Sequence, residues 1–304
     1  MSNESTATYA AFGLVICSEV ILPQVPPAPA DAPIDVRVVR ADLSDLDSMP
    51  EGGIYQDNLI AFEATGVGRF RITDGSLIEV MPLCAEELHH LAVYVLGSCM
   101  GAVIHQRGMF PIHGSCVTNG VRSVLITGDS GAGKSTLAAE FLSRGWRLLT
   151  DDVAVICDPL GEEGGPIVQP SYPSQKLWAD SMERYGVDDD QVHSLYARNG
   201  REKYGIDVAT SFCVQPAPLT LIIRLAAVED FPTTVQPVEG FAKVDQLVNN
   251  TYRAYMIAPE NRQQHFQRCV TMGTHIPMAL AVRNKSEQTA ALLCDRIIEY
   301  MEAL

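Results

Sequence analysis

The run Gly128-Asp129-Ser130-Gly131-Ala132-Gly133-Lys134-Ser135 contains the residue types that bind a phosphate group. It matches G-x-x-x-x-G-K-[ST], the phosphate-binding P-loop, and is called the glycine loop below. Glycines let backbone N–H groups approach phosphate oxygens without a side chain in the way. Lys134 can place a positive charge on the β- and γ-phosphates, and the Ser135 hydroxyl can bind Mg²⁺. We therefore expect ATP and Mg²⁺ as cofactors, bound by this loop and by Thr136 directly after it.

The segments on either side of the glycine loop fit this interpretation. Residues 121–127 predict a strand that enters the loop, and residues 137–144 predict a helix that leaves it. Gly145 stands where a glycine commonly ends a helix. The positive N-terminal end of such a helix attracts the same anion. The alternative is a glycine-rich turn that binds nothing.

Asp151 and Asp152 are the candidates for the chemistry that a nucleotide-binding loop alone does not supply. We expect them in a strand over residues 146–156, directly after the helix, so that the sheet returns them to the phosphates. Successive side chains of a strand lie on opposite faces, so only one of the two faces the nucleotide squarely. A carboxylate there can hold Mg²⁺ or accept a proton from an attacking hydroxyl. A solvated pair of surface aspartates is the alternative.

Other polar side chains are candidates for supporting roles. His113 precedes a hairpin predicted by Asn119-Gly120, and its imidazole could orient a carboxylate or bind phosphate. Arg201 and Lys203 lie in a predicted flexible turn, where they could clamp a phosphoryl group or a peptide carboxylate. A solvated loop is the alternative for Arg201 and Lys203, and Lys176 leaves the same choice open. For His113 the alternative is a purely structural histidine.

Three segments together resemble the catalytic domain of HPr kinase/phosphorylase. They are Ile-His-Gly at residues 112–114, Val-Leu-Ile-Thr followed by the glycine loop, and Arg-Gly-Trp-Arg-Leu-Leu-Thr-Asp-Asp at residues 144–152. The resemblance implies an α/β fold with a mixed sheet and a P-loop related to that of phosphoenolpyruvate carboxykinase. It also implies transfer of phosphate from ATP to a serine hydroxyl. Lys134 would then bind phosphate, Ser135 the metal, and Asp152 the proton, with His113 close by and Asp151 assisting the metal.

The sequence also departs from that family. Its members carry a glutamate metal ligand in a glycine-rich signature, whereas residues 169–178 here read Gln-Pro-Ser-Tyr-Pro-Ser-Gln-Lys-Leu-Trp. The whole layout, including residues 97–115, is similar to HPr-kinase-like proteins of peptide biosynthesis, among them lasso-peptide kinases. These phosphorylate the C-terminal serine of a precursor peptide, so the resemblance implies a peptide substrate. Two alternatives are an HPr kinase/phosphorylase acting on a carrier protein and a non-catalytic ATP-binding module that delivers a peptide. HPr kinases form hexamers, so the resemblance leaves a homo-oligomer open.

The rest of the chain predicts two domains, a small β-rich unit over residues 1–82 and a catalytic domain over residues 83–304. The first unit should contain strands within residues 9–22, at 34–39, 54–55, 59–64, 68–73 and 77–81. A helix should follow over residues 85–106. Helices are also expected at 174–185, 188–197, 244–250, 262–272 and 286–303, and strands at 278–282 and within 167–178 and 205–225.

Composition narrows the class of partner. A formal net charge of −15 in 304 residues argues against binding nucleic acid or an anionic membrane surface. No stretch is long and apolar enough to span a bilayer, and residues 1–8 lack the pattern of a signal peptide. The eight cysteines form no C-x-x-C pair, which favours reduced thiols and a cytoplasmic protein.

Overall fold

A computed structural model describes residues 6–84, 88–157, 165–178, 192–198, 201–287 and 289–304. The chain divides into two compact units, which are described one at a time. Unit 1 comprises Met1–Pro111 and Tyr252–His265, and unit 2 comprises Ile112–Thr251 and Phe266–Leu304. The boundary expected after residue 82 thus falls inside unit 1.

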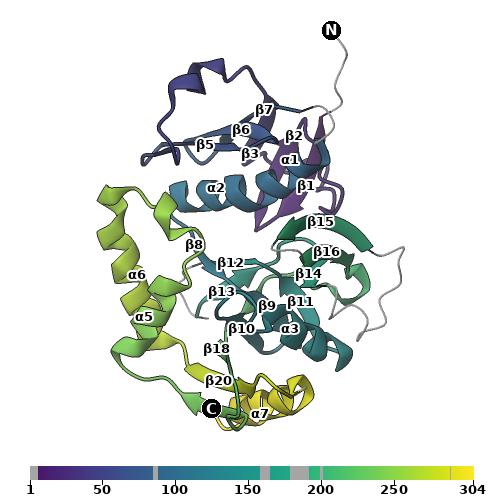
Figure 1. The fold of residues 1–304 in the computed structure, drawn as a ribbon, viewed down its shortest axis with the longest axis vertical. Helices are drawn as coiled ribbons and strands as arrows, with labels where there is room; N and C mark the ends of the chain where they lie inside the picture. The colour runs from purple at the N-terminus through teal and green to yellow at the C-terminus, as the bar shows by residue number, and fades with distance from the viewer. Residues whose placement is uncertain (1–5, 85–87, 158–164, 179–191, 199–200, 288) are drawn as a thin grey trace. The chain divides into compact units, whose positions relative to one another are not determined.

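Unit 1 is built on a seven-stranded sheet with the order β1-β2-β3-β7-β6-β5-β4, drawn in purple and blue in Figure 1. The pairs β2–β3 and β3–β7 are parallel, and the other pairs are antiparallel. The predicted strands of this region are confirmed. They are β1 (Ala7–Ala11), β2 (Leu14–Ser18), β3 (Val36–Arg40), β4 (Ile54–Tyr55), β5 (Leu59–Ala64), β6 (Gly68–Thr73) and β7 (Leu77–Pro82).

The turn between β6 and β7 shows how the local sequence sets the register of this sheet. Asp74 and Gly75 both have positive φ, at 52° and 59°. The Ser76 N–H donates to the Thr73 carbonyl at 3.1 Å and closes a turn with Asp74 and Gly75 at its centre, which Asp-Gly favours because both residues tolerate positive φ. Thr73 then pairs with Leu77, so three residues separate the two strands. In both strands every second side chain is buried, which is the two-residue period of a sheet with one covered face.

One continuous helical segment covers that face and explains why the boundary lies beyond residue 82. It runs through α1 (Leu88–Tyr94), a π-helical turn (Val95–Cys99) and α2 (Met100–Gln106). The Tyr94 ring stacks on Phe70 of β6, with ring centroids 5.6 Å apart. The predicted helix is therefore confirmed over residues 88–106, while residues 85–87 lie outside the described part. Short 3₁₀ turns complete unit 1 at Ser44–Ser48, Ala254–Met256 and Pro259–Asn261.

Unit 2 contains a mixed six-stranded sheet with the order β11-β9-β10-β18-β20-β19. Its strands are β9 (Ser115–Thr118), β10 (Ser123–Thr127), β11 (Arg147–Thr150), β18 (Leu221–Val228), β19 (Thr234–Pro237) and β20 (Met278–Asn284). The central pairs β10–β18 and β18–β20 are parallel, and the flanking pairs are antiparallel. This confirms the predicted α/β class with a mixed sheet.

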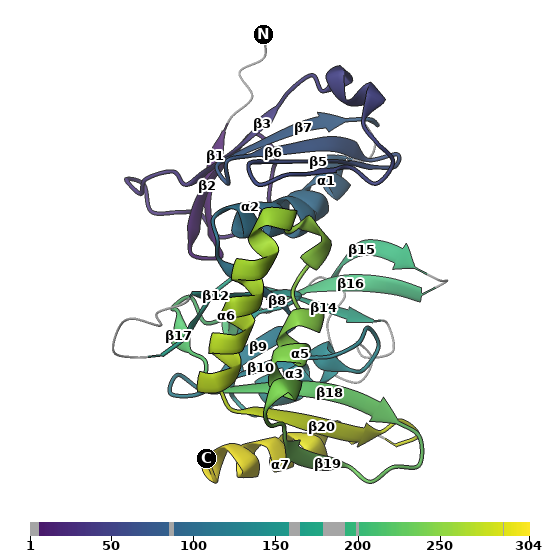
Figure 2. The ribbon, with the colours of Figure 1, turned by 90° about the vertical axis from the view of Figure 1, so that its left-hand side faces the viewer.

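Helices α3 (Lys134–Ser143) and α7 (Ala290–Glu302) share a hydrophobic core with this sheet. Phe141 of α3 and Ile297 of α7 are fully buried in it, together with Ile126 and Ile223 of the central strands. Figure 2 shows α7 beside β20 and β19. The predicted helices are also confirmed at α5 (Phe241–Asn249) and α6 (Arg262–His275), whose first four residues belong to unit 1.

Two smaller sheets complete unit 2. The four-stranded sheet has the order β17-β13-β12-β8 and the three-stranded sheet the order β14-β16-β15. Their strands are β8 (Phe110–His113), β12 (Val153–Cys157), β13 (Ile167–Gln169), β14 (Ser174–Trp178), β15 (Val192–Arg198), β16 (Arg201–Asp207) and β17 (Ala217–Pro218), with a 3₁₀ turn at Ala209–Ser211. The first two residues of β8 belong to unit 1.

The helices predicted at 174–185 and 188–197 are wrong where the structure describes them. Residues 174–178 and 192–198 are strands, both paired with β16, while residues 179–191 lie outside the described part. Strand pairing has overridden the helical spacing of the local sequence, since residues 174–178 pair with a strand more than 20 residues further along the chain and residues 192–198 pair with the strand that follows them. Within the described residues, no helix combines the length and the apolar character needed to cross a membrane.

Candidate functional site

The glycine loop joins the buried strand β10 to helix α3, as the sequence predicted. Gly128, Gly131 and Gly133 have φ values of 127°, 85° and 105°, which L residues with side chains rarely adopt. A Cβ atom on Gly128 would lie 2.3 Å from the carbonyl oxygen of Leu225. Asp129, Ser130 and Gly131 are exposed, so this part of the loop is open to a ligand.

Lys134 lies at the first position of α3, and its side chain turns back over the loop. Its Nζ donates to the backbone carbonyls of Gly128, at 2.7 Å, and Asp129, at 3.2 Å. The ammonium group is therefore already held above the loop. A bound phosphate would compete with these two neutral carbonyls for the Lys134 ammonium group. Hydrogen bonds between charged groups are stronger than those to neutral acceptors, so the phosphate would be favoured.

Two further side chains fix the loop from outside it. Asn250, the residue after α5, accepts a hydrogen bond from the Gly128 N–H at 3.2 Å through Oδ1, and its backbone oxygen accepts the His113 N–H at 2.7 Å. Arg283 of β20 donates from Nε to the Ala132 carbonyl at 2.8 Å, and burial lowers the pKa of its guanidinium. The glycine loop is thus linked to the backbone of His113 through Asn250 and to the six-stranded sheet through Arg283.

Asp151 and Asp152 do not lie within a strand, which corrects the sequence prediction. Strand β11 ends at Thr150 and β12 begins at Val153, and the two strands belong to different sheets. The two aspartates form the connection between them, with Asp152 in the left-handed region at φ 74°. Aspartate tolerates this conformation better than most residues. The two carboxylates are therefore placed by a tight connection, and not by the alternation of a strand.

The Asp151 carboxylate is buried, with 6% of the residue exposed. Its Oδ1 accepts a hydrogen bond from the hydroxyl of Ser115, which is also buried, and its Oδ2 accepts the backbone N–H of Lys176 at 2.7 Å. Both carboxylate oxygens therefore have donors. In this arrangement Asp151 joins β9, the β11–β12 connection and β14.

The Asp152 carboxylate lies between two basic side chains. Its Oδ2 is 2.7 Å from Nζ of Lys176, and its Oδ1 is 3.5 Å from Nδ1 of His113. The same Nδ1 lies 2.9 Å from the backbone oxygen of Asp152. Because these oxygens only accept hydrogen bonds, Nδ1 carries the proton in neutral His113. This assignment leaves Nε2 as the acceptor nitrogen of the ring.

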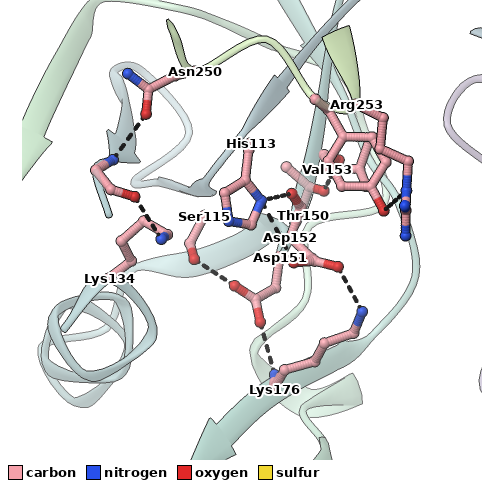
Figure 3. A network of polar contacts seen from close by, with 12 residues as sticks. His113, Ser115, Lys134, Thr150, Asp151, Asp152, Val153, Lys176, Asn250 and Arg253 are labelled. Atoms are coloured by element: carbon pink, nitrogen blue, oxygen red, sulfur yellow. Dashed lines mark hydrogen bonds and ion pairs between the residues drawn. The ribbon is translucent and has the colours of Figure 1, made fainter. Parts of the chain in front are cut away.

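His113 lies between the glycine-loop side of the site, with Lys134 and Asn250, and the side that holds the two aspartates (Figure 3). Burial lowers the pKa of His113, the Asp152 charge raises it, and the Lys134 charge lowers it again. Hydrogen bonds connect the same groups, because Asn250 accepts the N–H groups of both His113 and Gly128, and Nδ1 of His113 bonds to the Asp152 backbone oxygen. Figure 3 shows His113 between Lys134 on one side and Asp152 on the other.

The remaining predicted residues are placed as follows. Arg201 and Lys203 lie in strand β16, so the flexible turn expected for them is wrong. Ser135, at the second position of α3, accepts a hydrogen bond through its backbone oxygen from Nε2 of Gln175, at 2.9 Å. Among the residues that the structure describes, no three His, Cys, Asp and Glu side chains stand together as metal ligands. Mg²⁺ often uses only one or two carboxylates together with phosphate oxygens, so Ser135 and Asp151 remain chemically suitable donors.

Sequence reasoning did not assign a role to Ser115 or Asn250, and it left Lys176 undecided. Ser115 directly follows the Ile-His-Gly segment, which was a usable signal. The contacts of Lys176 and Asn250 depend on strand register and on the end of α5, respectively, and neither can be inferred from spacing along the chain.

Comparisons with known proteins give little further guidance. No protein-family model and no curated protein matches the chain. Among solved structures, the chain is similar to the Hpr(Ser) kinase/phosphatase from Coxiella burnetii, with 14% identity and a TM-score of 0.35. The match covers 64% of this chain and 91% of the other. A likeness at this level assigns no activity, so the function must be argued from the residues of this chain.

Proposed function

We propose that this protein is a kinase that uses ATP and Mg²⁺ to phosphorylate a serine hydroxyl of a peptide. The observation that supports this proposal is a chain of hydrogen bonds from the glycine loop to Asp152 (Figure 3). Asn250 accepts the N–H groups of Gly128 and His113, and Nδ1 of His113 bonds to the Asp152 backbone oxygen. These contacts support the proposal because they connect the glycine loop, proposed to bind phosphate, with the carboxylate proposed to accept the proton. Phosphoryl transfer needs this combination of positioning, charge stabilisation and a group that orients the nucleophile.

The reaction follows from these positions. The glycine loop N–H groups and Lys134 hold the triphosphate and stabilise the charge on its γ-phosphoryl group. As the acceptor oxygen forms its bond to the γ-phosphorus, its proton moves to the Asp152 carboxylate. The bond from the γ-phosphorus to the bridging oxygen breaks, and ADP leaves with that electron pair. Proton transfer to a positioned base typically contributes about 10²–10⁴ in rate.

The Mg²⁺ in this proposal would be held by the Ser135 hydroxyl and by Asp151. Each carboxylate oxygen of Asp151 keeps a second lone pair besides the one that accepts a hydrogen bond. Bound Mg²⁺ neutralises charge on the phosphate oxygens. The chain's own contribution is to hold Asp151 in place through Ser115 and the Lys176 N–H.

For the acceptor, we propose the C-terminal serine of a lasso precursor peptide. This choice rests on the sequence resemblance, and the net charge of −15 favours a neutral or basic peptide over a nucleic acid. The eight cysteines, all within the described residues, form no disulfide, which fits a cytoplasmic reaction within the same proposal. Arg201 and Lys203 remain proposed contacts of the peptide or the phosphate.

Mass spectrometry of intact acceptors tests this proposal. The protein is incubated with Mg-ATP and either a serine-terminated precursor peptide, the same peptide ending in alanine, or the carrier protein HPr. We expect a phosphate mass increment only on the serine-terminated peptide. An increment on HPr would instead support the carrier-protein kinase, and ATP binding without transfer to any acceptor would support a peptide-delivery module.

A further inference from the structure

Strand β14 makes three contacts with the site from two consecutive residues. Gln175 donates to the Ser135 carbonyl at the start of α3, at 2.9 Å. The backbone N–H of Lys176 donates to Asp151, and its Nζ contacts Asp152, both at 2.7 Å. One strand of the three-stranded sheet is therefore bonded to the glycine-loop helix and to both aspartates.

The Lys176–Asp152 ion pair is largely shielded from water. The side chain of Lys176 is 12% exposed and that of Asp152 is 20% exposed. Screening by solvent and salt is weaker for such a pair than for a pair on the surface. Burying two charges costs solvation energy, so the pair is not explained simply as a source of stability.

The pair restricts the Asp152 carboxylate in a way that bears on its proposed role. Nζ of Lys176 binds Oδ2, while Oδ1 is the oxygen on the His113 side, 3.5 Å from Nδ1. Asp152 lies in the connection between β11 and β12 and has a φ of 74°. The regular geometry of a strand therefore does not set the direction of its side chain. The ammonium group of Lys176 therefore fixes which oxygen of Asp152 is directed toward the histidine.

We propose that Lys176 is a positioning residue for phosphoryl transfer, holding Oδ2 of Asp152 so that Oδ1 accepts the proton of the acceptor hydroxyl. This inference rests on the proposed kinase function. In the step itself the proton moves from the acceptor oxygen to Oδ1, the new oxygen–phosphorus bond forms, and ADP leaves with the electron pair of the broken bond. Lys176 stays on Oδ2 throughout and neither gains nor loses a proton.

A double-mutant cycle on the transfer rate tests this role. Lys176→Met is made in the wild type and in Asp152→Asn, and single-turnover phosphate transfer is measured with enzyme in excess. A displaced catalytic group costs about 10² in rate, so we expect Lys176→Met to slow transfer by about 10–100-fold. ATP affinity, measured with a fluorescent analogue, should change by less than about threefold. In the Asp152→Asn background the same substitution should produce no further loss.

Two additional variants make the test specific. Lys176→Arg retains a cation that can bind Oδ2, so we expect it to recover most of the lost rate. Lys285→Met removes a lysine of unit 2 whose side chain is 61% exposed, and it should leave transfer and ATP affinity unchanged. If Lys176→Met does not fold, Lys176→Gln takes its place in the cycle.

The outcomes separate this inference from the function on which it rests. An equal loss in both backgrounds, a loss confined to ATP affinity, or no recovery with arginine would overturn the role of Lys176 while leaving the kinase intact. Absence of phosphate transfer by the wild type to any hydroxyl would overturn the proposed function itself.

Discussion

The hydrogen bond from Ser115 to Asp151 can be removed with a small change. Ser115 is 1% exposed and Asp151 is 6% exposed, so no bulk water can easily replace the hydroxyl in Ser115→Ala. A hydrogen bond to a charged group is worth about 1.5–3 kcal/mol when its loss leaves the buried partner unsatisfied. A domain of roughly 150–250 residues loses about 2–4 °C in Tm for each kcal/mol. We therefore expect Ser115→Ala to lower the Tm of unit 2 by about 3–12 °C.

Differential scanning calorimetry of the whole chain at neutral pH measures this effect. Ser143→Ala is the matched control, because Ser143 is exposed on α3 and its hydroxyl donates to the nearby Glu140 carbonyl. Exposed substitutions of this kind usually change stability by less than about 0.5 kcal/mol. A shift for Ser115→Ala no larger than that of the control would refute the conclusion that Asp151 is held by a buried network.

Three further predictions concern the loop and the thiols. Gly128→Ala should abolish binding of a fluorescent ATP analogue. The alanine Cβ would lie 2.3 Å from the Leu225 carbonyl oxygen, and the φ of 127° at this position is one that alanine rarely adopts. Retained affinity for the analogue would contradict the close packing of the loop. Lys134→Ala should weaken both ATP binding and phosphate transfer, and an unchanged Kd would exclude contact between this lysine and the phosphates. Burial raises the pKa of Cys269 and Cys294 to about 12, so iodoacetamide at pH 8 should leave both unlabelled in the folded protein. Peptide mapping by mass spectrometry reads out the labelling, with the half-buried Cys17 as the reactive comparison.

The strands of unit 1 and the glycine loop could be predicted because residues close together in the sequence determine these structures. The strands of unit 1 show alternating apolar positions, and Asp74-Gly75 selects the hairpin turn between β6 and β7. The glycine loop was predictable for the same reason, since its three glycines have positive φ values and Gly128 also packs closely against the Leu225 backbone. These features depend on residues that are neighbours along the chain.

The errors arose where pairing or contact with another segment decides the structure. Residues 174–178 and 192–198 became strands because both pair with β16, which their own spacing does not indicate. The aspartate pair was expected in one strand, but the chain changes sheets at that point and Asp152 adopts left-handed geometry. The role of Lys176 depends on the register that brings β14 to this connection.

The ratio of single-turnover transfer rates between the wild type and Asp152→Asn is the most direct test of the central claim. It is measured with saturating Mg-ATP and a serine-terminated peptide, and Asp245→Asn, an exposed aspartate of α5, is the control. Loss of the proton acceptor predicts a ratio of about 10²–10⁴ for Asp152→Asn, with ATP still bound, and a ratio near one for Asp245→Asn. A ratio near one for Asp152→Asn would contradict the assignment of Asp152 as the base and the mechanism built on it.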